Sequence, residues 1–146
     1  MSEFLELVVD KFIFRMATNC HYTDEGLWVR LEGNQVRVGL SDFAQQRSGD
    51  VAFVEVKPAG SMLNAKDELI VLETIKVNTS YGSPVSGKIL STNAKLLSNP
   101  EVINQDPYGE GWIALLETTH WTEDAAQLLT PQGYYDLAQR LAEQEV

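Results

Sequence analysis

The chain has 146 residues, of which 44% are hydrophobic and 22% charged, which is typical of a single globular domain. One cysteine excludes an internal disulfide, and no apolar run approaches the roughly 18 residues of a membrane span. Eleven Lys and Arg against 21 Asp and Glu give a net charge of −10, which disfavours nucleic acid or an anionic membrane as partner. Charges interrupt residues 4–11 before a signal peptide can form, so we expect a cytoplasmic monomer.

The first two thirds of the chain predict short strands. Residues 27–31 and 35–40 alternate in polarity around a turn that contains Gly33, which indicates a hairpin. A short helix is expected over residues 41–47, with Ser41 as its N-cap and Gly49 closing it. The further strands expected, separated by Gly and Pro turns, are 51–56, 69–75, 88–90 and 112–116.

The end of the chain has a helical pattern. Thr130-Pro131 is a favoured helix start, and the four residues that then form one apolar face are Tyr134, Leu137, Ala138 and Leu141. We expect an amphipathic helix packed on the β-core. From residue 117 onward there are six acidic residues and one basic residue, which indicates a solvated acidic tail or, alternatively, steering toward a basic partner.

The residues that usually carry catalysis or metal binding are sparse. Cys20 and His21 are neighbours, and on a strand they would point to opposite faces, so the histidine could not activate the thiol. No Gly-rich phosphate loop precedes a helix, and no pair of carboxylates stands out by its spacing. The sequence predicts no catalytic residue and no metal site.

Lys76 stands at the end of a predicted apolar strand, just before the polar Asn78. On spacing alone such a lysine is a solvated edge residue. Ile75 and Val77 flank it in alternation, so we expect them to turn inward and to hold Lys76 outward.

Lys76 belongs to a set of segments that together resemble the glycine cleavage system H protein family, a family of lipoyl carriers. These segments are Tyr22-Thr23, Trp28-Val29, 38–45, 49–55, Glu73 to Lys76, Pro84 to Gly87 and, most distinctively, Asp106 to Trp112. The resemblance implies a mainly β fold with added helices, a lipoyl/biotinyl-type barrel-sandwich hybrid with a C-terminal amphipathic helix. It implies one carrier domain over residues 1–146, with an N-terminal extension (1–21) and a helical tail (122–146) packed on it.

The same resemblance implies the site and its cofactor. Lys76 would carry covalently bound lipoate, attached by a lipoate ligase that Glu73 helps to guide, and protein made without ligase or lipoate would be the apo form. The chain would then be a non-catalytic swinging-arm carrier. A biotin carrier is the nearest alternative, but such proteins usually place methionines beside the lysine, where this chain has Ile75 and Val77. A purely structural interaction module is the other alternative.

Departures from the family pattern bear on the client enzymes, the enzymes between which the carrier would shuttle its cargo. Gly26-Leu27 precedes Trp28 where the family usually has His-Glu, the residues flanking Lys76 differ, and residues before Tyr22 are unlike the usual start. These changes resemble the lipoate-binding proteins that serve a heterodisulfide-reductase-like complex in sulfur oxidation, and we take this as the first hypothesis. The alternative is a glycine cleavage H protein that carries an aminomethyl group between glycine decarboxylase and its partners, with reoxidation by a dihydrolipoyl dehydrogenase.

Gly82, just before Ser83-Pro84, carries a smaller prediction. A glycine there suggests a backbone with positive φ. The alternative is that it leaves room for the lipoyl arm or a partner.

Overall fold

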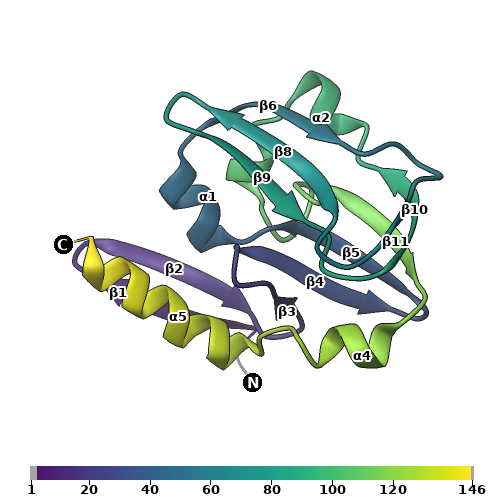
Figure 1. Ribbon diagram of the computed structural model, residues 1–146. Coiled ribbons are helices and arrows are strands. Elements are labelled where there is room, and N and C mark those ends of the chain that lie inside the picture. The colour runs from purple at the N-terminus through teal and green to yellow at the C-terminus, as the bar shows by residue number, and fades with distance from the viewer. Residues whose placement is uncertain (1–2, 146) are drawn as a thin grey trace.

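The structure is a computed structural model that describes residues 3–145, and β-strands dominate it (Figure 1). The strands are β1 (Phe4–Val9), β2 (Phe12–Ala17), β3 (His21–Tyr22), β4 (Leu27–Glu32), β5 (Gln35–Leu40), β6 (Val51–Val56), β7 (Met62–Leu63), β8 (Glu68–Thr74), β9 (Asn78–Gly82), β10 (Gly87–Thr92) and β11 (Ala114–Thr118). The helices are α1 (Asp42–Ser48), α2 (Lys95–Ser98), α3 (Val102–Gln105), α4 (Trp121–Ala125) and α5 (Pro131–Gln144). None of the helices within residues 3–145 is long and apolar enough to cross a membrane.

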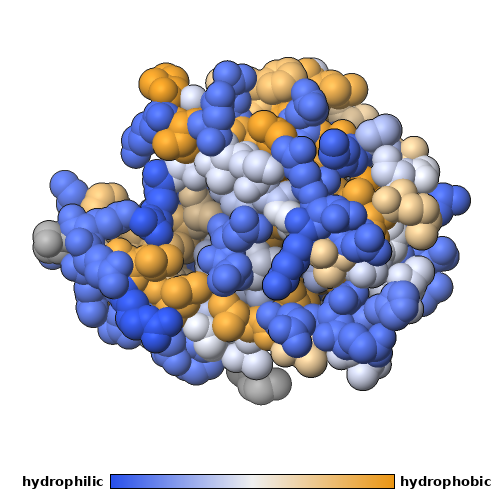
Figure 2. All heavy atoms as spheres, in the orientation of Figure 1, coloured by the Kyte–Doolittle hydropathy of each residue, from blue (hydrophilic) through white to orange (hydrophobic). Residues whose placement is uncertain are grey.

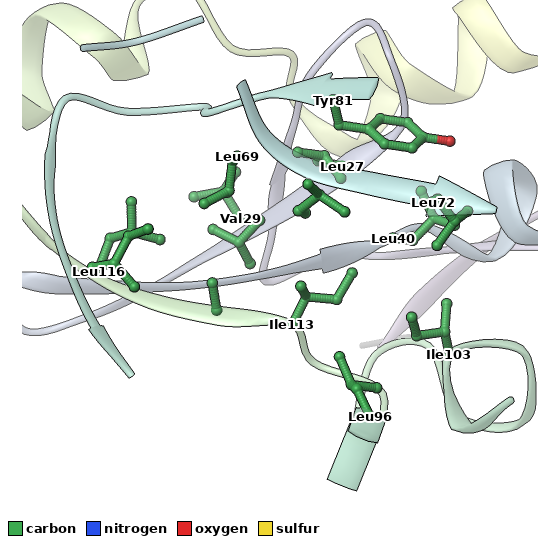
Figure 3. Close-up of a cluster of buried hydrophobic side chains, with 14 of the residues drawn as sticks. Leu27, Val29, Leu40, Leu69, Leu72, Tyr81, Leu96, Ile103, Ile113 and Leu116 are labelled. Atoms are coloured by element: carbon green, nitrogen blue, oxygen red, sulfur yellow. The ribbon is translucent and has the colours of Figure 1, made fainter. Parts of the chain in front are cut away.

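Two antiparallel sheets enclose the main core. One has six strands in the order β3-β4-β5-β11-β10-β7, and the other has three in the order β6-β8-β9. Figure 3 shows the side chains that fill the space between them, among them Val29 and Leu40 from the first sheet and Leu69 and Leu72 from the second. These four are at most 1% exposed. The expected mainly β barrel-sandwich fold with added helices is confirmed.

The predicted turns and caps are confirmed in detail. The hairpin of β4 and β5 turns through Gly33, whose φ of 70° is the left-handed conformation that such a tight turn needs. Ser41 caps α1 by accepting a hydrogen bond from the Ala44 backbone N–H, and Gly49 ends it with φ 86°. The expected start of α5 is also present, because Thr130 accepts a hydrogen bond from the Gly133 N–H.

A second, smaller core lies beside the sandwich, between the N-terminal hairpin (β1 and β2) and α5. Its buried members include Phe14 from the hairpin, Phe43 from α1, Trp28 from β4 and Tyr134 from α5. The C-terminal helix was expected on the β-core, but it packs mainly on this hairpin, as Figure 1 shows. The reason is that the N-terminal hairpin presents an apolar face to α5. Nothing in the local sequence pattern indicates that the hairpin lies next to this helix.

Candidate functional site

Lys76 lies at the tip of the hairpin formed by β8 and β9. Strand β8 pairs with β6 on one side and β9 on the other, and its last pair before the turn joins Glu73 to Asn78. The turn is short, and Lys76 at its centre is exposed. Figure 1 shows this tip projecting from one end of the three-stranded sheet. A strand held on both sides gives the lysine a rigid base.

Thr74 organises the turn. Its hydroxyl oxygen accepts hydrogen bonds from the backbone N–H groups of Lys76 and Val77, at 3.2 and 3.1 Å. Its own backbone N–H donates to the Val77 carbonyl at 2.9 Å. Thr74 is only 7% exposed, so its position is fixed by the sheet beneath. Thr74 was not among the residues expected at the site, although a hydroxyl residue just before a turn is a known signal for such bonds.

The expectation for the residues flanking Lys76 is wrong. Ile75 is 93% exposed and Val77 44% exposed, so neither turns inward. The reason is that β8 ends at Thr74, and alternation holds only within a strand. Phe53, on the neighbouring strand β6, is opposite Glu73 and is 53% exposed. The lysine tip therefore presents an apolar surface around a basic residue.

The Lys76 side chain extends over the end of α1. A Cβ placed on Gly49 would stand 3.7 Å from Lys76 Cε and 3.9 Å from Cδ, so the methylene stem passes the glycine at van der Waals distance. Within residues 3–145, no carboxylate forms an ion pair with the lysine amine. An exposed amine without a charged partner fits a group that is attached through an amide. Glu73 is exposed nearby, at the last strand pair.

Two of the other segments of the family pattern, Pro84 to Gly87 and 106–112, support the fold. Pro84 to Gly87 follows β9 at the end opposite the tip, and a Cβ on Gly87 would stand 2.0 Å from the Glu117 carbonyl oxygen. In the distinctive segment 106–112, the Pro107 carbonyl accepts a hydrogen bond from Trp28 Nε1 at 2.8 Å. These positions therefore secure strand contacts rather than cofactor chemistry.

Gly82 does not have positive φ, so that part of its prediction is wrong. A Cβ at this position would lie 2.8 Å from the Lys66 carbonyl oxygen and 3.0 Å from its Cα. A side chain there would collide with backbone, which cannot move as a flexible side chain can. Glycine is therefore needed at position 82 so that the end of β9 can approach the backbone of Lys66 closely.

Gly26, one of the departures from the family pattern, also has a packing reason. Its φ is +110°, and a Cβ built on it would lie 2.7 Å from Ala44 Cβ in α1. Any larger residue at position 26 would push α1 away from the start of β4. This departure follows from local packing and does not by itself point to a different client.

Cys20 is buried, and burial raises the pKa of its thiol to about 12. The ring of His21 packs edge-on against Trp121, at 5.4 Å between centroids. Within residues 3–145, no group of three or more His, Cys, Asp or Glu side chains is arranged to hold a metal ion.

A small β-sandwich that presents one lysine at the tip of a rigid hairpin is the arrangement of a protein that carries a covalent arm. The comparisons make this class specific: the sequence model of the Glycine cleavage H-protein family matches residues 20–141. The chain belongs to this family. Its members are non-catalytic carriers with lipoate covalently attached to a lysine.

Individual relatives agree with the family match. The chain is 39% identical over 113 residues to the glycine cleavage system H protein of Anoxybacillus flavithermus, covering 77% of this chain and 88% of the relative. It is 47% identical over 97 residues to that of Coprothermobacter proteolyticus, covering 66% and 76%. The crystal structure of a glycine cleavage system H protein from Mycobacterium marinum superposes with a TM-score of 0.76 at 28% identity, covering 83% of this chain and 97% of that one. The N-terminal hairpin, residues 4–17, precedes the family match.

Proposed function

We propose that this protein is the lipoyl carrier of a glycine-cleaving system and that its lipoate is attached to Lys76. The observation that carries the proposal is the position of Lys76, exposed at the tip of a hairpin whose turn is tied together by Thr74. The amide bond to lipoate would remove the lysine charge and place a long flexible arm at the exposed tip of the hairpin. Lipoate, when bound, supplies the redox and acyl-carrying chemistry, and the protein supplies position.

The surroundings of Lys76 fit recognition by a lipoate ligase. Glu73 precedes the turn, is exposed, and forms no ion pair within residues 3–145, so its carboxylate is available to a basic ligase surface. Ile75, which follows Thr74 in the turn, and Phe53, which lies opposite Glu73 on β6, add an exposed apolar surface next to this carboxylate. Tethering then raises the effective concentration of the arm at each partner enzyme that docks here.

The glycine-cleaving client replaces the sulfur-oxidation hypothesis. The relatives described above are all glycine cleavage system H proteins, and they give no support to a heterodisulfide-reductase-like partner. One departure that favoured sulfur oxidation, Gly26, is explained by its contact with Ala44. We therefore infer that the cargo is an aminomethyl group and that the partners are glycine decarboxylase, dihydrolipoyl dehydrogenase and the ligase. The chain acts in this proposal as one cytoplasmic, monomeric carrier domain, with residues 1–21 and 122–146 as additions.

Attachment is tested by intact mass after co-expression with a lipoate ligase. The wild type is expected to gain one lipoyl group, and Lys76→Arg is expected to gain none while folding normally, because it keeps the positive charge. Lys88→Arg, an exposed lysine on β10, is the matched control and should be modified like the wild type. An unmodified wild type, beside a modified control lipoyl protein, would refute the site. An avidin blot separates biotin from lipoate.

The client is tested by exchange. The lipoylated protein is incubated with purified glycine decarboxylase, glycine and labelled bicarbonate, and label is expected to enter glycine. Lys76→Arg serves as the blank. Absence of exchange with a fully lipoylated carrier, where a known H protein supports it, would contradict the glycine-cleaving role and leave the carrier role standing.

A further inference from the structure

The turn of the N-terminal hairpin lies beside the lysine tip. The two share a hollow of about 340 Å³, whose lining includes Asp10 and Phe12 from the hairpin together with Lys76. Figure 1 shows the end of β8–β9 and the turn of β1–β2 on the same side of the molecule, with α1 between them. In the same orientation, Figure 2 shows the surface indented between these two ends. A protein that approaches Lys76 from this side therefore also meets the hairpin turn.

Both ends carry exposed apolar side chains. Ile75 and Val77, the neighbours of the lysine, are 93% and 44% exposed, and Phe12 is 49% exposed on the other side of the hollow. The ring of Phe14 supports Phe12, since the two are stacked with 6.1 Å between centroids and 14° between planes. Exposed apolar groups gathered at one place are typical of protein–protein contact. We give the name two-tip surface to five residues: Ile75, Lys76, Val77, Asp10 and Phe12.

Helix α1 holds the two ends at a fixed separation. On the hairpin side, Gln46 Nε2 donates a hydrogen bond to the Ile13 carbonyl at 3.0 Å, and Asp42 Oδ2 accepts one from a backbone N–H of β2 at 2.8 Å. On the lysine side, the methylene stem of Lys76 passes Gly49, which ends the same helix. A partner can bind both ends without ordering either of them, which lowers the entropic cost of binding.

The unpaired charged groups next to the two-tip surface are mainly acidic. Asp10 in the hairpin turn and Glu73 before the lysine turn are exposed, and neither forms an ion pair within residues 3–145. Arg47, which lines the hollow, is paired with Glu145. Lys11 follows Asp10 in the chain but does not line the hollow. A complementary partner therefore presents apolar side chains with basic residues at their margin.

The lipoate ligase is the partner whose chemistry requires contact at this place. In the attachment step the neutral amine of Lys76 attacks the carbonyl carbon of an activated lipoyl group, a mixed anhydride with a phosphate. The C–N bond forms, the bond from that carbon to the phosphate oxygen breaks with its electron pair, and the nitrogen loses a proton to water. The reacting atoms must approach to about 3–3.5 Å. The ligase therefore has to reach the lysine itself, whereas a client enzyme meets the dithiolane at the far end of the arm.

We propose that the two-tip surface is where the lipoate ligase binds this carrier, and that the N-terminal hairpin is a determinant of ligase recognition. This inference rests on the proposed attachment to Lys76. The hairpin precedes residues 20–141, which the family model matches, so contact at Asp10 and Phe12 is additional to the part of the chain that the family model covers. The ligase packs apolar side chains against both ends and places a basic residue near Asp10.

The test measures lipoylation of the full-length apo protein by the lipoate ligase of the same organism, as initial rates of mass gain over a range of carrier concentrations. Phe12→Ser should raise KM about tenfold and leave kcat unchanged, because the lost contact is made in the ground state and the transition state alike. Ile13→Ser is the matched control, since Ile13 is 47% exposed on the same strand, does not line the hollow and should keep the wild-type KM.

Asp10→Asn tests the charge without disturbing the turn, because asparagine also tolerates the φ of 53° at this position. It should raise KM about threefold at low salt and less at high salt, as expected for an exposed ion pair. Thermal unfolding shows that each variant is folded.

The outcomes separate this inference from the proposed function. No lipoyl mass on wild-type Lys76 would overturn both. Modification of Phe12→Ser and Asp10→Asn with the wild-type KM would overturn the ligase contact and leave the carrier function standing. Equal increases of KM in Phe12→Ser and Ile13→Ser would also overturn it, because a general loosening of the hairpin would explain them. A fall in kcat alone would overturn it too, since the hairpin would then position the lysine instead of binding the ligase.

Two other occupants have their own signatures, and either would overturn the proposal. If a client enzyme binds the two-tip surface, fully lipoylated Phe12→Ser loses glycine exchange while its KM for lipoylation stays at the wild-type value. If a second copy covers the surface, sedimentation velocity shows a wild-type dimer that Phe12→Ser dissociates. A rise in KM confined to Phe12→Ser and Asp10→Asn, in a monomeric protein with normal exchange once lipoylated, would establish the ligase contact.

Discussion

The rings of Tyr22 and Tyr134 stack face to face, with 4.5 Å between centroids and 4° between planes. Tyr22 belongs to the edge of the six-stranded sheet and Tyr134 to the C-terminal helix. The Tyr134 hydroxyl lies 2.6 Å from Ser41 Oγ, the same oxygen that caps α1. This one stacked pair therefore joins the carrier sandwich, α1 and α5, and through α5 it positions the N-terminal hairpin beside Lys76.

Replacing Tyr134 by phenylalanine should show the value of that hydroxyl. The stack is kept and one buried hydrogen bond is lost, so we expect the free energy of unfolding to fall by about 1 kcal/mol. Tyr135→Phe, at the half-buried next position, is the control and should change stability by less than about 0.5 kcal/mol. Urea denaturation of the three proteins makes the comparison. Equal effects of both variants would contradict a special role for the Ser41 contact.

Thr74 should control both stability and modification of the lysine tip. Thr74→Val keeps the shape but removes the acceptor for the Lys76 and Val77 N–H groups, at a cost of about 1–2 kcal/mol. Lipoylation by the ligase should slow as the turn loosens, whereas Thr74→Ser, which retains the oxygen, should restore it. The measurement is the initial rate of mass gain. A valine variant that is modified at the wild-type rate would show that the turn geometry does not matter to the ligase.

Gly82→Ala should destabilise the fold because of contact with backbone. The added Cβ would meet the Lys66 carbonyl at 2.8 Å, and overpacking of this kind costs about 1–3 kcal/mol. Gly33→Asn is the contrasting variant, since asparagine tolerates a positive φ and nothing lies within 4 Å of that position. Thermal unfolding should show a lower Tm for the first and little change for the second. An unchanged Tm in Gly82→Ala would mean that the Lys66 segment yields easily.

Glu32 gives the protein a pH-dependent surface contact. Its carboxylate accepts hydrogen bonds from Arg37 Nε at 3.0 Å and Nη2 at 3.2 Å, and the bonding to Arg37 first, then to Arg30, lowers its pKa. Because the pKa is lower in the folded state, the contribution is full above the ordinary glutamate pKa of about 4.3 and is lost as pH falls through the folded value. We expect Glu32→Gln to cost under about 1 kcal/mol at pH 7, since the pair is partly exposed. In denaturation series at several pH values, the difference from wild type should vanish in acid, and a constant difference would point to packing instead.

Local chemistry made much of the fold predictable from the sequence. The Ser41 cap, the Gly33 turn and the Thr130-Pro131 helix start each depend on residues within four positions of each other, and all three form as expected. Long-range contacts were not predictable in this way. The docking of α5 on the N-terminal hairpin and the approach of Lys66 to Gly82 join segments that no local pattern relates.

The candidate site likewise combines features that local sequence indicates with features that depend on long-range contacts. Lys76 is proposed as the site because of a resemblance carried by several distant segments, whereas its spacing alone indicated only an edge residue. The inward orientation expected for Ile75 failed because a strand pattern was extended one residue into a turn. Thr74, which ties that turn, bonds to residues only two and three positions further along the chain, so a hydroxyl residue just before a turn was a usable sequence signal. The position of the N-terminal hairpin beside Lys76 depends on tertiary placement and became visible only in the structure.

Cys20 should not react with thiol reagents in the native protein, so thiol labelling of the lipoylated protein should report only the sulfurs of the lipoyl arm. Burial raises its pKa to about 12, so at pH 8 its thiolate fraction is about a thousandfold below that of an ordinary cysteine. Alkylation of native apo protein should accordingly be slow and become fast only in denaturant, with Cys20→Ser as the blank. Since the chain has one cysteine, reduced holo protein should show two fast-reacting thiols, both from the arm. Rapid labelling of native apo protein without loss of structure would contradict the burial of Cys20.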